Sequence, residues 1–239
     1  MPSLAEREPA GRHPSGAPVR QRLAAPAGGE LQRELRQTYR VDLLAPFLGE
    51  HTDARVVLYA PTWRDGDPDP GMPGQAQWQR IVEVCERLDL VLLIRPHPLG
   101  VGDYTFGHDR VRLITPAEQP ESMPLLWGVS ALITDYSSII YEYALLRRPM
   151  LFYSYDREVY AATRGFHHDF ATTAPGKVCD TFDELLRALR DQDFETEKVD
   201  AFVAQNFNYV DTGSADRVID WLILGEPPRA QGDEHDRRK

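Results

Sequence analysis

The middle of the chain alternates short apolar runs with longer stretches whose apolar residues recur at helical spacing. The short runs are typical of strands that are buried on both faces, and the spaced ones are typical of amphipathic helices. We expect strands at residues 55–60, 90–94, 111–114, 131–134 and 150–153. We expect helices at residues 30–48 (broken near Pro46), 75–88, 121–128, 139–148, 181–190 and 211–224. Strands that alternate with helices predict right-handed crossovers and a mainly parallel sheet.

The fold class that follows is α/β, with a Rossmann-like parallel sheet and helices on both faces. Several nucleotide and hydrolase signatures are missing from the sequence. There is no G-x-G-x-x-G after the first strand, no G-x-x-x-x-G-K-[ST] and no G-x-S-x-G. These absences weigh against a dinucleotide dehydrogenase, a P-loop NTPase and an α/β-hydrolase.

The ends of the chain differ in composition from its middle. Residues 1–29 are rich in Ala, Gly and Pro without regular apolar spacing, and we interpret them as a disordered or remnant segment. Residues 30–50 predict a linker helix, residues 51–224 the Rossmann-like domain, and residues 225–239 a charged tail.

Two regions near the C-terminal end carry more specific expectations. Residues 154–176 predict a long polar loop, and Thr181 with Glu184 forms a capping box that opens the next helix. In the last helix we expect four apolar side chains to face inward: Val218, Ile219, Trp221 and Leu222.

Charge and cysteine content exclude some classes of protein. The formal net charge of −10 disfavours general nucleic-acid binding, which needs basic surface against phosphates. Cys85 and Cys179 are far apart, which argues against a zinc site or a disulfide framework and fits a reducing compartment. No apolar run approaches the roughly 18 residues that span a bilayer. We therefore expect a cytoplasmic protein without a metal or cofactor, and leave peripheral association with the inner membrane face open.

The stretch from Ala131 to Tyr153 predicts a strand, a tight loop, a helix and another strand. Ser137 and Ser138 stand where the helix begins, and Pro149 stops it. Backbone N–H groups at a helix N-terminus favour anions, and in an open parallel sheet this loop lies at the ligand-binding edge. From this stretch alone, the serines fit a phosphate site and a simple helix cap equally well.

Polar residues follow three of the predicted strands and should meet at one edge of the sheet. They are Thr62, Arg64 and Asp65 after the first strand, Arg95 and His97 after the second, and Asp135, Ser137 and Ser138 after the fourth. The two prolines of Arg95-Pro96-His97-Pro98 stiffen that turn. Arg offers a planar fork for phosphate oxygens, and a protonated His would neutralise charge on a leaving group. A solvated surface turn is the alternative.

The remaining polar candidates have ordinary explanations beside the functional ones. Arg164 would reach a ligand phosphate or simply belong to a turn, and His167-His168 are expected in solvent. Glu142 lies one helical turn after Ser138, where it would accept bonds from ligand hydroxyls or pair with Arg147 or Arg148.

Four motifs occur together in one order: LYAPTWRDG at 58–66, LLIRPHP at 92–98, LITDYSSIIYEYALLRRPMLFYSYD at 132–156 and RGFHHDF at 164–170. On these motifs the chain resembles the CDP-glycerol glycerophosphotransferases of teichoic-acid and capsule synthesis. The resemblance covers about residues 55–224. It implies the C-terminal, donor-binding half of a GT-B fold and transfer of glycerol phosphate from CDP-glycerol to a polyol-phosphate or glycan acceptor, with release of CMP.

The resemblance also implies roles for the matching residues. Arg95 and His97 would meet the donor diphosphate as catalytic groups, with His97 stabilising the departing CMP. Ser137 and Ser138 would bind phosphate oxygens. The rest of the donor pocket would contain Asp135, Glu142, Thr62, Arg64 and Arg164.

Two departures from the family pattern limit this expectation. No His-Gly pair occurs in the sequence, whereas the family carries a His-Gly-Thr segment in its acceptor-side domain. Ser130-Ala131 stands where the family usually has an Asp. The chain alone is thus expected to bind donor without transferring it. The alternatives are a non-catalytic nucleotide-binding or assembly module, and a GT-B transferase that uses CDP-ribitol or a nucleotide sugar.

Overall fold

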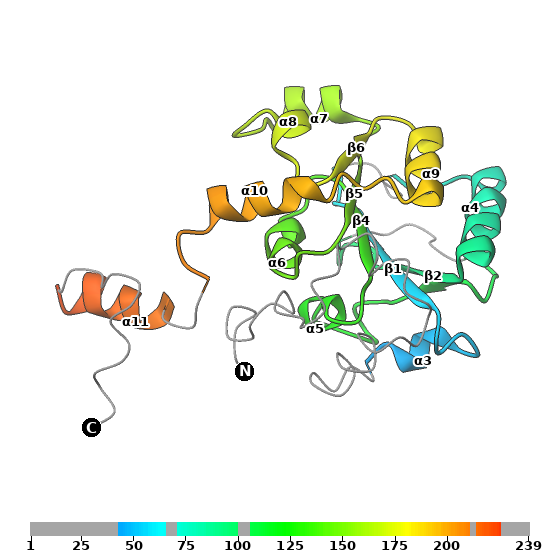
Figure 1. Cartoon of the computed structure of the whole chain (residues 1–239), viewed down its shortest axis with the longest axis horizontal. Coiled ribbons are helices and arrows are strands. Elements are labelled where there is room, and N and C mark those ends of the chain that lie inside the picture. Colours follow the sequence, from blue (N-terminus) through cyan, green and yellow to red (C-terminus); the bar gives the residue numbers. More distant parts are fainter. Residues whose placement is uncertain (1–42, 66–70, 100–105, 211–213, 226–239) are drawn as a thin grey trace.

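The computed structural model describes residues 43–65, 71–99, 106–210 and 214–225. Its centre is one parallel sheet of six strands in the order β3-β2-β1-β4-β5-β6 (Figure 1). The strands are β1 Arg55–Ala60, β2 Leu90–Ile94, β3 Val111–Leu113, β4 Ala131–Thr134, β5 Met150–Tyr153 and β6 Lys177–Cys179. This order confirms the predicted Rossmann-like sheet, with its topological switch point between β1 and β4.

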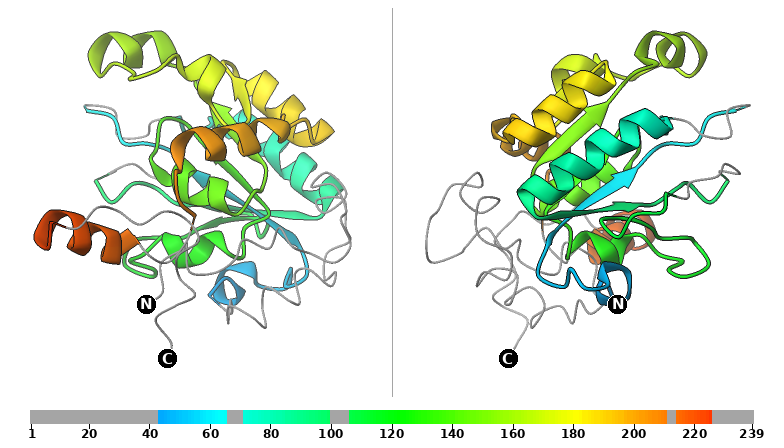
Figure 2. Two further views of the ribbon diagram at one scale, coloured as in Figure 1. Left: turned by 60° about the vertical axis from the view of Figure 1, so that its left-hand side comes forward. Right: turned by 90° about the vertical axis from the view of Figure 1, so that its right-hand side faces the viewer.

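Helices cover both faces of the sheet (Figure 2). One face packs against α3 (Ala45–Leu48), α5 (Met123–Leu126), α6 (Ile139–Leu145) and α10 (Glu197–Asn206). The other packs against α4 (Gln75–Leu88) and α9 (Phe182–Asp191). Alternate residues of one strand serve the two cores: Val56 and Leu58 of β1 join the first, while Val57 and Tyr59 join the second.

The capping box of α9 is confirmed. The Thr181 side chain accepts from the N–H of Glu184, and the Glu184 carboxylate accepts from the N–H of Thr181 at 3.3 Å. The reciprocal bonds satisfy donors that a helix start leaves free.

The predicted helix at 30–48 lies mostly outside the described residues. Its described part begins α3 at Ala45, so Pro46 opens a helix rather than breaking one.

The end of α6 differs from the predicted helix at 139–148. The helix ends at Leu145, and Arg147 adopts a left-handed φ of 51° beyond it. Arg147 pairs with Asp200 of α10, and Arg148 donates to the carbonyls of Trp127 and Val129 at 2.7 Å each. Arg147 and Arg148 therefore lie beyond the helix, where they connect its end to α10 and to the segment after α5.

The region predicted as a polar loop at 154–176 contains two short helices, α7 (Arg157–Thr163) and α8 (Phe170–Thr173). The strand β6 and the helix α10 were also missing from the sequence prediction.

Another correction concerns α11 (Ser214–Val218) and the π-helical turn η2 (Ile219–Ile223), which stand apart from the sheet in Figure 1. Their apolar side chains face outward, with Trp221 60% exposed and Leu222 72% exposed. Within the described part of the chain, no helix combines the length and apolarity that a bilayer crossing requires.

Candidate functional site

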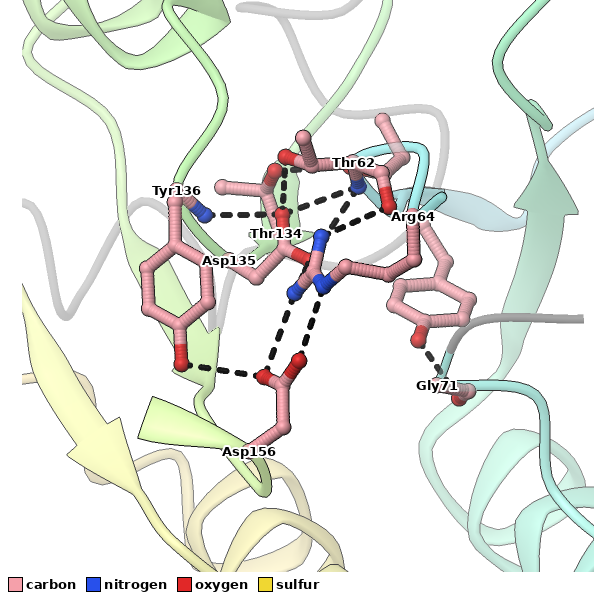
Figure 3. A network of polar contacts seen from close by, with 9 residues as sticks. Thr62, Arg64, Gly71, Thr134, Asp135, Tyr136 and Asp156 are labelled. Carbon is pink, nitrogen blue, oxygen red and sulfur yellow. Dashed lines mark hydrogen bonds and ion pairs between the residues drawn. The ribbon is translucent and has the colours of Figure 1, made fainter. Parts of the chain in front are cut away.

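The loops that follow β1 and β4 meet at the switch point of the sheet. Thr134, the last residue of β4, donates its hydroxyl to the carbonyl of Ala60, the last residue of β1, at 2.7 Å. Just beyond, Asp135 accepts from the backbone N–H of Thr62 at 2.9 Å (Figure 3). The predicted neighbourhood of these two strand ends is therefore present, at the place where open α/β sheets bind ligands.

Asp135 is the buried centre of this junction, with 3% of its surface exposed. Its carboxylate accepts from the Thr62 hydroxyl, from the N–H of Tyr136 at 2.7 Å and from the Arg64 guanidinium at 2.9 Å. Burial raises the pKa of the Asp135 carboxyl, and the donors from Arg64 and Thr62 oppose that rise. The side chain is directed into the protein, where it joins the two loops.

Arg64 is held by carboxylates on two sides. It donates to Asp156 through Nε at 2.8 Å and to Asp135 through a terminal nitrogen, while another donates to the carbonyl of Thr62 at 2.8 Å (Figure 3). The rings of Tyr136 and Tyr160 lie 5.1 and 4.8 Å from its guanidinium carbon. Burial lowers the pKa of Arg64, but the bond to Asp156 and both carboxylate charges raise it above its ordinary value. In this structure Arg64 therefore bonds protein groups, and its expected place in the donor pocket stays a prediction.

Asp156 and Tyr136 also belong to this junction, although sequence reasoning did not single them out. The Tyr136 hydroxyl donates to Asp156 at 3.1 Å, and burial raises the pKa of Tyr136 above its ordinary range. The Tyr136 ring packs against Tyr160, Phe166 and Phe170, with centroids 4.1, 5.1 and 5.0 Å away. Asp156 lies in the loop after β5, as Asp135 lies in the loop after β4. A search for polar residues after each predicted strand could therefore have found it.

Arg95 lies at the end of β2 as predicted, but its guanidinium points into the protein. It is 6% exposed and donates to the carbonyls of Thr115 at 2.9 Å and Pro120 at 3.0 Å. Burial lowers the pKa of Arg95. The side chain thereby holds the segment after β3 in place. Its expected role at the donor diphosphate stays a prediction.

His97, two residues later, is exposed at the carboxyl edge of the sheet. Its ring lies 6.5 Å from the ring of Trp63, centroid to centroid, at an interplanar angle of 28°. Because Trp63 stands between Thr62 and Arg64, the β1 loop contacts both the β2 turn and the β4 corner. The three polar clusters predicted from the sequence thus converge at one edge of the sheet.

The serine corner lies directly after Asp135. Ser138 is the exposed N-cap residue of α6, and its side chain makes no cap bond. The Ser137 hydroxyl accepts weakly from the N–H of Ile139 at 3.4 Å. Glu142 is half-buried on α6, and its expected alternative partners, Arg147 and Arg148, bond elsewhere.

Arg164 reaches the same edge from the turn between α7 and α8. It forms an ion pair with Asp65, and its guanidinium carbon lies 6.0 Å from the Trp63 ring. His167 and His168 are exposed, as expected. Within the described ranges, no three His, Cys, Asp or Glu side chains lie close enough to share a metal ion.

The edge therefore has two levels with different chemistry. The lower one is a set of bonded charges in which Asp135 is buried and its partners Arg64 and Asp156 are half-buried. The upper one exposes an imidazole, a serine hydroxyl and a guanidinium, at His97, Ser138 and Arg164. These exposed groups include hydrogen-bond donors and a cation, which suit a phosphorylated ligand.

Comparisons with known proteins agree with the sequence resemblance. The family model described as CDP-Glycerol:Poly(glycerophosphate) glycerophosphotransferase matches residues 30–224. The teichoic acid ribitol-phosphate polymerase TarK of Staphylococcus aureus (strain NCTC 8325 / PS 47) is 36% identical over 168 residues, which are 69% of this chain and 33% of TarK. The teichoic acid poly(glycerol phosphate) polymerase of Bacillus spizizenii (strain ATCC 23059 / NRRL B-14472 / W23) is 29% identical over 188 residues, 74% of this chain and 46% of that protein.

Solved structures of the wall teichoic acid polymerase TagF share the fold. One TagF variant superposes with a TM-score of 0.58 at 27% identity, over 81% of this chain and 50% of TagF. A variant soaked with CDPG gives a TM-score of 0.55 at 28% identity, over 81% of this chain and 49% of that one. The chain thus spans about a third to a half of the proteins it matches. By the family match over most of its length, it belongs to the CDP-glycerol:poly(glycerophosphate) glycerophosphotransferase family.

Proposed function

We propose that residues 51–224 form the donor-binding domain of a CDP-glycerol glycerophosphotransferase, the C-terminal half of a GT-B enzyme. The observation that supports this proposal is that His97 and Arg164 both lie beside the Trp63 ring, in the β1 loop that Asp135 joins to the start of the β4 loop. The chain that forms this edge belongs to the glycerophosphotransferase family. The carboxyl edge of an open parallel sheet, at its switch point, is where such sheets bind ligands.

The reaction we propose is transfer of glycerol phosphate from CDP-glycerol to a polyol-phosphate or glycan acceptor in teichoic acid or capsule synthesis. An acceptor hydroxyl oxygen attacks the phosphorus that bears glycerol, the bond from that phosphorus to the CMP oxygen breaks, and CMP leaves. The hydroxyl proton goes to a base on the acceptor side. In-line positioning and stabilisation of charge on the leaving oxygen supply the rate.

The exposed residues take the ligand-facing roles. His97 stabilises the departing phosphate, Ser137 and Ser138 donate to phosphate oxygens, and Arg164 exchanges Asp65 for a ligand phosphate. Glu142 accepts from a glycerol or ribose hydroxyl.

The residues whose polar groups are bonded within the protein take supporting roles. Thr62, Arg64 and Asp135 hold the β1 and β4 loops in place, and Arg95 holds the segment after β3. Their contribution is to fix the positions from which the exposed groups act.

Titration calorimetry of the chain with CDP-glycerol tests the donor role. We expect saturable binding for the unaltered chain, weaker binding for His97→Ala, and unchanged binding for His108→Ala. His108 lies just before β3, at the opposite edge of the sheet from the site. A folded chain that shows no heat and no rise in melting temperature at millimolar CDP-glycerol contradicts the proposal.

A second donor deserves the same experiment, because the relatives include ribitol-phosphate polymerases such as TarK. CDP-ribitol binding tighter than CDP-glycerol binding assigns the chain to ribitol transfer, and a nucleotide sugar that outcompetes both assigns it to another GT-B transferase. Binding without transfer, in an enzyme complete with its acceptor half, assigns it to a non-catalytic module.

A further inference from the structure

Two groups of the protein fix the ring of His97, although the side chain is exposed. The N–H of Leu99 donates to Nδ1 of His97 at 3.2 Å, across the single residue Pro98. The Trp63 ring lies alongside the imidazole at an interplanar angle of 28°. The bond from Leu99 engages one particular nitrogen of the ring, and the contact with Trp63 sets the plane of the ring.

The Leu99 bond decides which nitrogen carries the proton. A ring nitrogen accepts a hydrogen bond only when it has no hydrogen of its own. Nδ1 is therefore unprotonated, and the neutral imidazole carries its hydrogen on Nε2. In this state the ring presents an N–H donor at Nε2. A second proton on Nδ1 would meet the N–H of Leu99 and break the bond.

The chemistry of the leaving group fits a donor of this kind. In the proposed reaction CMP departs as a phosphate monoester, whose second pKa of about 6 makes it a stable anion at neutral pH. Such a group needs its developing charge stabilised, and it does not need a proton to leave. A fixed, neutral N–H supplies that stabilisation without being consumed.

Trp63 also connects His97 to the rest of the edge. The Arg164 guanidinium carbon lies 6.0 Å from the Trp63 ring, and Arg164 pairs with Asp65 two residues after Trp63. The Trp63 indole therefore has two neighbours at this edge, the Arg164 guanidinium and the His97 imidazole. The ring is half-buried, which limits its freedom to turn away.

We propose that Trp63 and the N–H of Leu99 are the positioning groups that hold the His97 imidazole with its hydrogen on Nε2, so that Nε2–H donates to the departing phosphate. This inference rests on the proposed function. It assigns His97 the role of a hydrogen-bond donor rather than that of an acid that gives up its proton, which departs from the sequence-based expectation of a protonated ring.

Nitrogen-15 NMR of the imidazole rings tests the proposal in the ligand-free chain, with His97→Gln used to assign the signals. We expect His97 to show an unprotonated Nδ1 and a protonated Nε2 at slightly alkaline pH. Leu99→Ala keeps the backbone N–H and should keep this pattern, because the Leu99 side chain is 59% exposed. Leu99→Pro removes the N–H and should give a mixture of tautomers. A protonated Nδ1 in the unaltered chain, or a Leu99→Pro spectrum identical to it, overturns the assignment.

Trp63 is tested through its ring. Trp63→Phe should preserve the ring-current shift of the His97 protons in part and keep CDP-glycerol binding within about threefold, while Trp63→Ala should abolish the shift and weaken binding about tenfold. Backbone amide spectra confirm that both variants are folded. Unchanged His97 shifts in Trp63→Ala overturn the role of Trp63. Failure of the unaltered chain to bind CDP-glycerol contradicts the proposed function and the leaving-phosphate role, whereas the tautomer itself is decided by the ligand-free spectra.

Discussion

The buried and the exposed polar groups at the carboxyl edge of the sheet contain the same residue types but use them differently. Below, Arg64 pairs with Asp135 and Asp156, and the three side chains are 5 to 16% exposed. Above, Arg164 pairs with Asp65, and the two side chains are 49 and 67% exposed. An ion pair in water contributes little and exchanges easily, whereas a buried one is costly to break. The arginine–aspartate pairs at this edge therefore differ: the inner pairs hold loops together, whereas the outer pair is free to exchange its partner.

The difference between the two levels is tested most directly by removing one arginine from each of them. Arg64→Met keeps a long side chain but leaves two carboxylates without their cation. We expect a loss of about 3–5 kcal/mol in the free energy of unfolding, measured by urea denaturation. Arg164→Met should lose less than about 1 kcal/mol, because water already solvates both partners. Equal losses in the two variants contradict the division into two levels.

A smaller effect is expected from the threonine that bonds Asp135. Thr62→Val preserves the shape of the side chain and the backbone N–H, but removes the hydroxyl donor to a buried carboxylate. A hydrogen bond to a charged group contributes about 1.5–3 kcal/mol, and we expect a loss of that size in urea denaturation.

The matched control for that variant is Thr163→Val. Its hydroxyl donates to the carbonyl of Val159 at 2.8 Å on the exposed surface of α7. We expect its free energy of unfolding to change by no more than about 0.5 kcal/mol. Similar changes at both threonines show that Asp135 does not depend on the Thr62 hydroxyl.

The sequence predicted the places of these groups better than their directions. The apolar runs of β1, β2, β4 and β5 located the strand ends, and a parallel sheet brings such ends together. Arg64 and Arg95 were placed correctly but point inward. The Asp156 partner of Arg64 lies 92 residues away, and the partners of Arg95 are backbone carbonyls, which leave no mark in a sequence.

The C-terminal segment shows a related limit. The spacing of Val218, Trp221 and Leu222 indicated a helix with an apolar side, and α11 with η2 is helical. Periodicity identifies an apolar side but does not identify what covers it. The strand β6 escaped prediction because it has three residues, one of which is a lysine. The helices α7 and α8 have no regular apolar spacing and pack through single aromatic residues such as Tyr160 and Phe170.

The smallest expected effect belongs to the exposed level and concerns binding rather than folding. The Ser138 hydroxyl makes no cap bond, so Ser138→Ala should leave the free energy of unfolding unchanged. If the hydroxyl donates to a donor phosphate, its loss should weaken CDP-glycerol binding by about 1 kcal/mol, roughly fivefold in calorimetry. Ser122→Ala is the matched control, because Ser122 is also an N-cap residue without a side-chain cap bond. A destabilised Ser138→Ala with full affinity would make the serine a structural residue and move the phosphate contact elsewhere on this edge.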